Sequence, residues 1–141
     1  MISFEFIDVE VPELSSELFS LWLAEVARTE GKITSEITLI FCSDEYLLEM
    51  NRQYLDHDYY TDIITFDYSE NLVISGDLFI SIDRVYDNAE QNVVSRINEL
   101  KRVCVHGVLH LCGFGDKTDD EVRVMRGKED YYLDKYVSRG T

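Results

Sequence analysis

The stretch of sequence that says most about this chain is Val105-His106-Gly107-Val108-Leu109-His110-Leu111-Cys112-Gly113-Phe114-Gly115-Asp116-Lys117. Its first part continues an apolar helical pattern that covers about Val94 to Cys112. Its two later glycines predict a turn directly after that helix. The next four residues, Thr118-Asp119-Asp120-Glu121, form a capping box, which predicts a last helix that extends to about Val137. The stretch therefore predicts two helices joined by a short glycine turn.

Upstream of this stretch the sequence predicts three more helices and four strands. Alternation at period two and β-rich composition predict the strands Ile2–Asp8, Glu36–Cys42, Asp62–Asp67 and Leu72–Ile82, the last two forming a hairpin around Ser69–Asn71. Four-residue apolar spacing and capping residues predict the helices Leu14–Thr29, Asp44–Tyr54 after Ser43, and about Asp83–Asn92 with Asp83 as its cap. This order predicts an α+β (mixed α/β) fold with a mixed sheet of about four strands and helices packed on it.

The length and composition of the chain indicate one folded domain. A typical domain holds roughly 100 to 150 residues, so a chain of 141 residues leaves no room for a second core. Its hydrophobic fraction of 45% and aromatic fraction of 12% exclude an intrinsically disordered chain. We therefore expect residues 1–141 to form a single domain.

The sequence also predicts a cytoplasmic protein. No stretch approaches the roughly 20 uncharged apolar residues of a membrane span, and residues 1–10 are acidic where a signal peptide is basic. The three cysteines, Cys42, Cys104 and Cys112, show no Cys-x-x-Cys spacing and none of the density of a disulfide scaffold. We expect them to be reduced, buried thiols.

The chain is very acidic, and its charge is unevenly distributed. It has 13 lysines and arginines against 28 aspartates and glutamates, a net charge of −15. This charge disfavours a nucleic-acid binder, because neutralising phosphates requires a basic surface. Residues 1–83, however, hold 3 basic and 18 acidic side chains, whereas residues 84–141 hold 10 of each. The C-terminal part is therefore neutral, and a cleft there could still bind a nucleic-acid strand.

His106 and His110 are the candidate metal ligands of the sequence. Side chains four residues apart project from the same face of a helix, so both imidazoles can bind one ion. Asp116, just beyond the glycine turn, is the candidate third ligand. The histidines share a polar stripe with Glu99 and Arg102, opposite an apolar stripe, which is typical of a cleft. The alternative interpretation is that both histidines are ordinary core or surface residues.

The ligand set favours a catalytic zinc ion. Three protein ligands leave one position for water, and Cys112, which could close the site as a fourth ligand, points away from the imidazole face. Two histidines and one carboxylate also match nonhaem iron oxygenases, so zinc is favoured while another divalent transition metal stays open. A carboxylate ligand should leave the bound water less acidic than three imidazoles would. Gly107 stands where His-Glu-x-x-His proteases carry their general base, which excludes that class.

The whole stretch resembles the motif His-Gly-x-Leu-His-Leu-x-Gly-Tyr-Asp-His of the YbeY family, bacterial metal-dependent endoribonucleases also called ribosomal RNA maturation factors. Here the motif is matched by His106, Gly107, Leu109, His110, Leu111 and Gly113, with Phe114 for tyrosine, and upstream by Asn51, Tyr54, Thr61, Asp62, Thr65, Phe66 and Gly76-Asp77-Leu78. The resemblance covers nearly the whole chain. It implies a zinc-binding, single-strand-specific endoribonuclease that matures small-subunit ribosomal RNA and takes part in ribosome quality control. The implied partners are the small ribosomal subunit and its proteins.

The chain departs from the family pattern at two functional positions. Asp116 stands where the family has its third metal-binding histidine, and Leu55 stands where the family has an arginine that is suited to phosphate. Arg102 on the histidine stripe and Lys117 beside Asp116 are candidates to replace that cation, although both can also be solvated surface charges. His57 is a candidate proton carrier, with a bystander role as the alternative. We expect Asp62 and Asp77 to organise turns and strand ends.

The function predicted from the sequence is that of a metal-dependent endoribonuclease with about one zinc ion per chain. The alternative is a non-catalytic ribosome-assembly factor whose metal site is structural or vestigial, which the changes at Leu55 and Asp116 favour. A hydrolase or oxygenase acting on small molecules is a weaker third hypothesis. Because the chain is so acidic, we expect its binding to free RNA to be weak and strongly salt-dependent, with specificity supplied by ribosomal proteins.

Overall fold

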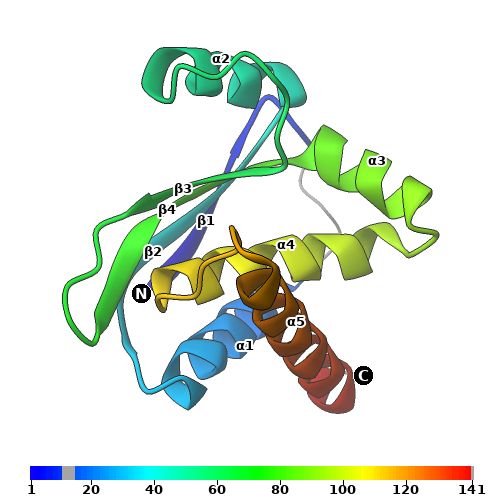
Figure 1. Ribbon diagram of the computed structural model, residues 1–141. Helices are drawn as coiled ribbons and strands as arrows, with labels where there is room; N and C mark the ends of the chain where they lie inside the picture. Colours follow the sequence, from blue (N-terminus) through cyan, green and yellow to red (C-terminus); the bar gives the residue numbers. More distant parts are fainter. Residues whose placement is uncertain (11–14, 141) are drawn as a thin grey trace.

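The computed structural model describes residues 1–10 and 15–140, in which one sheet separates two layers of helices (Figure 1). Helix α2 covers one face of the sheet, while α1, α4 and α5 lie on the other face. The elements in chain order are β1 Ile2–Ile7, α1 Ser16–Thr29, β2 Ile33–Cys42, α2 Asp44–Tyr54, β3 Ile63–Asp67, β4 Val73–Ser81, α3 Ile82–Gln91, α4 Arg96–Leu111 and α5 Asp119–Gly140.

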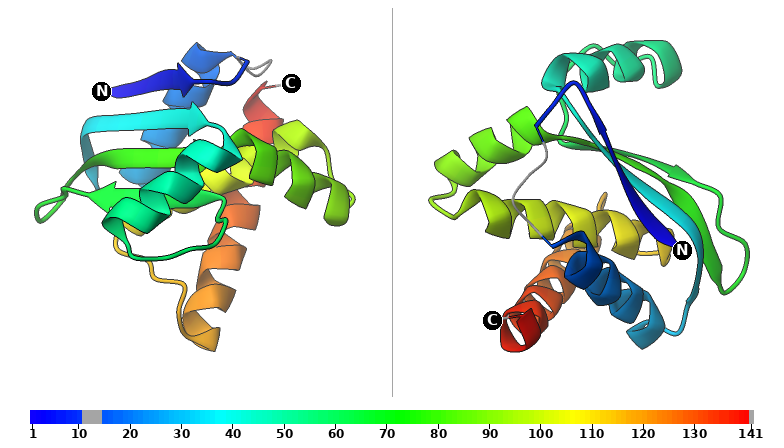
Figure 2. Two further views of the ribbon diagram at one scale, coloured as in Figure 1. Left: turned by 90° about the horizontal axis from the view of Figure 1, so that it is seen from above. Right: turned by 180° about the vertical axis from the view of Figure 1, so that it is seen from behind.

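The sheet is mixed, as the sequence predicted. Its strand order is β1-β2-β4-β3, with β1, β2 and β4 parallel to one another and β3 antiparallel to β4. Strand β1 forms one edge of the sheet, which the two further views in Figure 2 make visible. The main core lies between the sheet and the α1, α4 and α5 layer, and a smaller core lies under α2. The predicted α+β fold is thus confirmed.

Several predicted boundaries differ from the observed ones for identifiable reasons. Strand β2 begins at Ile33, before the predicted start at Glu36, because Ile33 pairs with Val73 and donates its N–H to the Leu72 carbonyl at 2.8 Å. Helix α3 is capped by Ser81 rather than by Asp83, since the Ser81 hydroxyl accepts the Arg84 N–H. The predicted start of the first helix at Leu14 lies outside the described residues.

Helix α2 has both of its predicted bounds, and the last two helices lie within about three residues of theirs. Ser95 caps α4, which ends at Leu111, one residue before the predicted end. In the predicted capping box, the Thr118 hydroxyl accepts the Glu121 N–H and the Glu121 carboxylate accepts the Thr118 N–H, both at 3.1 Å. The N-terminus of α5 is therefore where the sequence placed it.

Glycine at position 107 lets α4 approach the sheet closely. A Cβ atom added to Gly107 would lie 2.8 Å from the Ile63 Cδ1 atom and 2.9 Å from the Leu78 Cδ1 atom. Gly107 directly follows His106 in α4 and packs against the sheet. The His106 side chain therefore projects from a different side of the helix. The histidine face of the helix is thereby left to face α5 and the cleft described below.

No helix in the described ranges has both the length and the apolar character that a membrane crossing requires. Cys42, Cys104 and Cys112 are free and buried, as predicted.

Candidate metal centre and cleft

His106, His110 and Asp116 come together at the end of α4. The Nε2 atoms of both histidines lie 3.2 Å from the same Asp116 oxygen, Oδ2. The two imidazole rings are 4.7 Å apart and nearly perpendicular, with an angle of 84° between their planes. The structure thus brings together the three residues that the sequence singled out as ligands.

The chain reaches this arrangement by reversing direction directly after α4. Gly113 adopts a φ of 107°, which L side chains rarely adopt, and its N–H donates to the His110 carbonyl at 3.0 Å. The next N–H, of Phe114, donates to the Leu109 carbonyl at 3.1 Å. These bonds close the helix end and carry Asp116 back over the imidazole face.

The three side chains fit a divalent metal ion. One ligand atom from each of them lies within 4.8 Å of the other two. A tetrahedral zinc ion with bonds of about 2.1 Å holds neighbouring ligands about 3.4 Å apart, close to the 3.2 Å between the carboxylate oxygen and each imidazole nitrogen. Two imidazole nitrogens and a carboxylate oxygen are also a common donor set for zinc and for other transition metals.

Glu129, which the sequence analysis missed, supports this cluster from α5. Its Oε2 atom lies 2.7 Å from His106 Nδ1, and its Oε1 atom accepts a hydrogen bond from Arg102 at 2.9 Å. The residue is only 5% exposed. A signal was present in the sequence, because Glu129 is a single acid within the apolar helical stripe formed by Met125, Tyr132 and Leu133.

The His106 and Glu129 side chains shift each other's pKa values. Burial lowers the pKa of His106, but the hydrogen bond and charge of Glu129, with the charges of Asp116 and Asp62, outweigh burial and raise it. Burial raises the pKa of Glu129, but hydrogen bonds from His106 and Arg102 outweigh burial and lower it. Both shifts favour the protonated form of His106 and the ionised form of Glu129.

A polar cleft of about 380 Å³ opens beside the cluster. Its walls come from α3, α4, α5 and the start of β3, and its lining residues include Asp62, Asn88, Asn92, Arg102, His106, Asp116 and Arg126. Burial raises the pKa of Asp62, while the nearby His106 charge opposes that rise. The Asp62 carbonyl also accepts the Ser81 N–H at 2.9 Å, so the residue both anchors a strand end, as expected, and faces the cleft.

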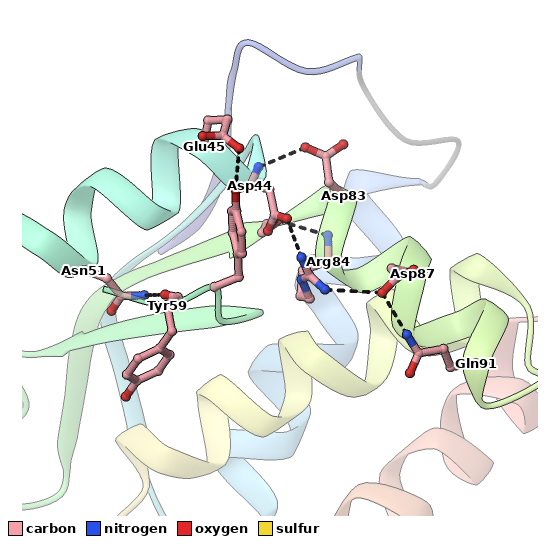
Figure 3. Close-up of polar contacts among 10 residues, drawn as sticks. Asp44, Glu45, Asn51, Tyr59, Asp83, Arg84, Asp87 and Gln91 are labelled. Atoms are coloured by element: carbon pink, nitrogen blue, oxygen red, sulfur yellow. Dashed lines mark hydrogen bonds and ion pairs between the residues drawn. The ribbon is translucent and has the colours of Figure 1, made fainter. Parts of the chain in front are cut away.

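The loop that leads into Asp62 is held by residues of α2 and α3 (Figure 3). Asn51, which is 1% exposed, donates its side-chain N–H to the Tyr59 carbonyl at 3.1 Å. The Tyr60 hydroxyl donates to Glu45 at 2.7 Å, and the Arg84 guanidinium lies 5.1 Å from the Tyr60 ring centre. These contacts fix the loop on the way to the cleft wall.

The other predicted site residues are placed less directly. Arg102 lines the cleft, but its guanidinium binds Glu129 at 2.9 Å and Asp130 at 2.6 Å. Lys117 is exposed, and its N–H donates to Glu121. His57 stacks on Tyr59, 5.0 Å between ring centres, and does not line the cleft. A catalytic role for these three residues stays a prediction.

Three further residues lie apart from the metal cluster. Cys112 is the buried C-cap of α4, and burial raises the pKa of its thiol to about 11, which disfavours the thiolate form that zinc requires. Asp77 lines a separate groove under α2 and accepts the Tyr68 hydroxyl at 3.4 Å. Leu55 is 41% exposed at the end of α2.

The chain is an α+β domain with a His-x-x-x-His helix, a carboxylate on the exit turn of that helix and a polar cleft beside them. These features give it the donor set of a metal-dependent hydrolase. Comparison with known families identifies the particular one. The family model described as Endoribonuclease YbeY matches residues 2–137, and the chain belongs to this family of RNA-cleaving enzymes. The resemblance inferred from the sequence motif is confirmed.

Individual relatives agree with this assignment. Proteins named Endoribonuclease YbeY are 52% identical in Parabacteroides distasonis, over 89% of each chain, and 52% identical in Phocaeicola vulgatus, over 94% of this chain and 96% of that one. The relative of that name in Cytophaga hutchinsonii is 58% identical over 79% of each chain. A solution structure of a Thermotoga maritima protein matches with a TM-score of 0.68 and 26% identity, covering 96% of this chain and 89% of that one.

Proposed function

We propose that this chain is a metal-dependent endoribonuclease that cleaves single-stranded ribosomal RNA, and that His106, His110 and Asp116 hold one zinc ion per chain. The observation that carries the proposal is the shared approach of two imidazole Nε2 atoms to one Asp116 oxygen, at 3.2 Å each, beside an open cleft in a member of an endoribonuclease family. Another divalent transition metal with the same preference for nitrogen and oxygen ligands is the alternative to zinc.

The bound ion would polarise a phosphoryl oxygen and lower the pKa of a bound water. The protein supplies the rest of the site. Arg126 lines the cleft and makes no ion pair with any residue that the structure describes, so it is available to a phosphate group, whereas Arg102 is already bound to two carboxylates. Asp62 contributes a carboxyl group to the same cleft, and Lys117 and His57 are the more exposed candidates for phosphate contact and proton transfer.

The biological role that we propose follows the family resemblance. The substrate is small-subunit ribosomal RNA during maturation and ribosome quality control, and the partners are the small ribosomal subunit and its proteins in the cytoplasm. Residues 1–141 act as a single metallohydrolase domain. With a net charge of −15, the chain should bind free RNA weakly and with strong salt dependence, so ribosomal proteins would supply much of the specificity.

Metal analysis and an RNA cleavage assay test the proposal together. Protein purified without chelator or metal-affinity resin should contain about one zinc ion per chain, as an open three-ligand site predicts. Wild type should cleave single-stranded ribosomal RNA, and His110→Ala should not. Trace metal content that chelation does not change would refute the metal site, and equal cleavage by both proteins would refute its catalytic role.

A second candidate function is ribosome assembly without catalysis. The exposed Leu55 in place of the family's arginine favours it, because this substitution removes a cation suited to phosphate. This hypothesis predicts that a folded His106→Ala protein still associates with ribosomes and supports normal maturation in cells. Defective maturation by that variant, with normal ribosome association, would support the catalytic role instead.

A further inference from the structure

We propose that Glu129 is a positioning residue for the metal centre, which holds the proton of His106 on Nδ1 so that Nε2 is directed at Asp116, and that Arg102 in turn holds Glu129 in place. The inference rests on the proposed function, in which His106, His110 and Asp116 bind a divalent ion. It assigns Arg102 to orientation of the site instead of contact with RNA.

The geometry of the Glu129 carboxylate leaves it one orientation. Its Oε2 atom accepts from His106 Nδ1 at 2.7 Å, and its Oε1 atom accepts from Arg102 at 2.9 Å. With one oxygen used on each side and only 5% of the residue exposed, the carboxylate cannot rotate without losing a buried charged hydrogen bond. Glu129 therefore connects α5 rigidly to the histidine face of α4.

The fixed orientation of the Glu129 carboxylate selects one tautomer of the His106 imidazole. A neutral imidazole carries one proton, on Nδ1 or on Nε2, and only the unprotonated nitrogen can bind a metal. Both nitrogens of His106 face a carboxylate, which accepts when ionised, but the buried Glu129 lies 2.7 Å from Nδ1 whereas the more exposed Asp116 lies 3.2 Å from Nε2. The shorter and more buried contact therefore favours the proton on Nδ1. That leaves the Nε2 lone pair free on the side of Asp116, 3.2 Å away. Among the described residues, His110 has no carboxylate at its Nδ1 atom.

Arg102 stabilises this arrangement from behind. Its guanidinium binds Glu129 at 2.9 Å and Asp130 at 2.6 Å, and its side chain is 20% exposed. Asp130 is the next residue to Glu129, is bound by the same arginine and is 59% exposed, but it does not contact His106. The pair Glu129 and Asp130 therefore separates the effect of touching the imidazole from the effect of pairing with Arg102.

The first measurement is zinc affinity of the metal-free protein, determined by competition with a chromophoric chelator. Glu129→Gln should weaken zinc binding about 10- to 100-fold, the usual effect of losing a carboxylate behind a metal-bound histidine. The matched control Asp130→Asn should change it by less than about threefold, as expected for an exposed ion pair. Arg102→Gln keeps Glu129 but removes the arginine that holds it, so its loss of zinc affinity should lie between those of the other two variants. Circular dichroism melting establishes that each variant is folded.

The second measurement needs no metal. Long-range ¹H–¹⁵N correlation spectra of the metal-free wild type, at a pH where imidazole is neutral, should show His106 with its proton on Nδ1. In Glu129→Gln the preference should be lost, because an amide can present either a donor or an acceptor to Nδ1. A His106 proton on Nε2 in wild type would overturn the inference, as would unchanged zinc affinity in Glu129→Gln. Correct tautomer selection in a wild type that binds no zinc would instead refute the proposed function.

Discussion

Two networks of arginine and carboxylate side chains join elements of this fold, and they differ in where their hydrogen bonds end. In the network beside the cleft, Arg102 binds Glu129, and Glu129 binds the Nδ1 atom of His106. The other side of that imidazole, its Nε2 atom, faces Asp116. The cleft network therefore ends at atoms that can bind a metal ion.

The second network lies at the ends of β2 and β4, where α2 and α3 begin (Figure 3). Asp44 accepts hydrogen bonds from the Ser81 hydroxyl at 2.9 Å and from Arg84 at 2.7 Å. Asp83 in turn accepts the Asp44 N–H at 2.9 Å. Each of these bonds joins one part of the fold to another, and none involves an imidazole. The comparison teaches that a cluster of charges indicates a functional site when it ends at imidazole and carboxylate atoms that can share a metal ion, and a structural joint when it only links one element to another.

Of the substitutions that test this comparison, replacing Asp116 should have the largest effect, a loss of zinc affinity. Asp116→Ala removes the oxygen that both Nε2 atoms approach, so zinc affinity should fall by more than about 100-fold, beyond the range for residues that support a ligand. Asp116→His restores an imidazole donor at the family's position and should retain zinc binding, with a more acidic bound water. Isothermal titration calorimetry on metal-free protein measures both affinities. Equal affinity of wild type and Asp116→Ala would mean that the ion binds elsewhere.

Asp44→Ala should have the opposite profile, with a large effect on stability and little on metal binding. The substitution removes the acceptor of the fully buried Ser81 hydroxyl and of one Arg84 guanidinium N–H, while Arg84 keeps its hydrogen bond to Asp87 at 3.2 Å. We expect the free energy of unfolding to fall by about 2 kcal/mol, as for other buried hydrogen bonds to charged groups. Urea denaturation measures this loss. A drop in zinc affinity as large as that of Asp116→Ala would show that the two networks are coupled.

The two networks also differ in how far the sequence predicted them. Helical spacing was sufficient for His106 and His110, and the glycine turn was sufficient for Asp116, because all three lie within eleven consecutive residues. Glu129 was missed because it reaches His106 from another helix, and local periodicity does not say which helix faces α4. The cap of α3 was predicted at Asp83 instead of Ser81 for a related reason. The position of the Ser81 hydroxyl depends on the pairing of β4 and on Asp44, and both are set by residues distant in sequence.

Glu99, beside the cleft network, should make the stability of the folded protein depend on pH. This residue on α4 is 7% exposed and lines the cleft, and burial raises the pKa of its carboxyl although the charge of Arg102 opposes the rise. An acid whose folded-state pKa is raised binds its proton more tightly in the folded state. Wild-type stability should therefore decline as pH rises from the ordinary glutamate pKa through the raised one.

Glu99→Gln should remove this decline. The variant should be slightly more stable than wild type at neutral pH, and the two should converge in acid, where Glu99 is protonated in both states. Urea midpoints of the metal-free proteins across this pH range measure the difference, with the exposed Glu90→Gln on α3 as the control. A Glu99→Gln protein that is less stable than wild type at neutral pH would mean that the ionised carboxylate is favourable in the cleft.

The smallest effect should come from Lys117, which lies next to Asp116 but belongs to neither network. Its side chain is exposed, and its N–H donates to Glu121 at 3.1 Å. Contacts between exposed charges contribute about 0.2–1 kcal/mol, so Lys117→Ala should raise KM for single-stranded RNA by no more than about fivefold while leaving kcat and zinc affinity unchanged. If Lys117 does contact a phosphate, the slope of log affinity against log salt should also become shallower by about 0.7, the value for one phosphate on a single strand. Lys117→Arg keeps the charge and should keep both KM and the slope. A fall in kcat of the size expected for His110→Ala would instead place Lys117 at the reacting phosphate, and the boundary of the cleft network would have to be extended to include it.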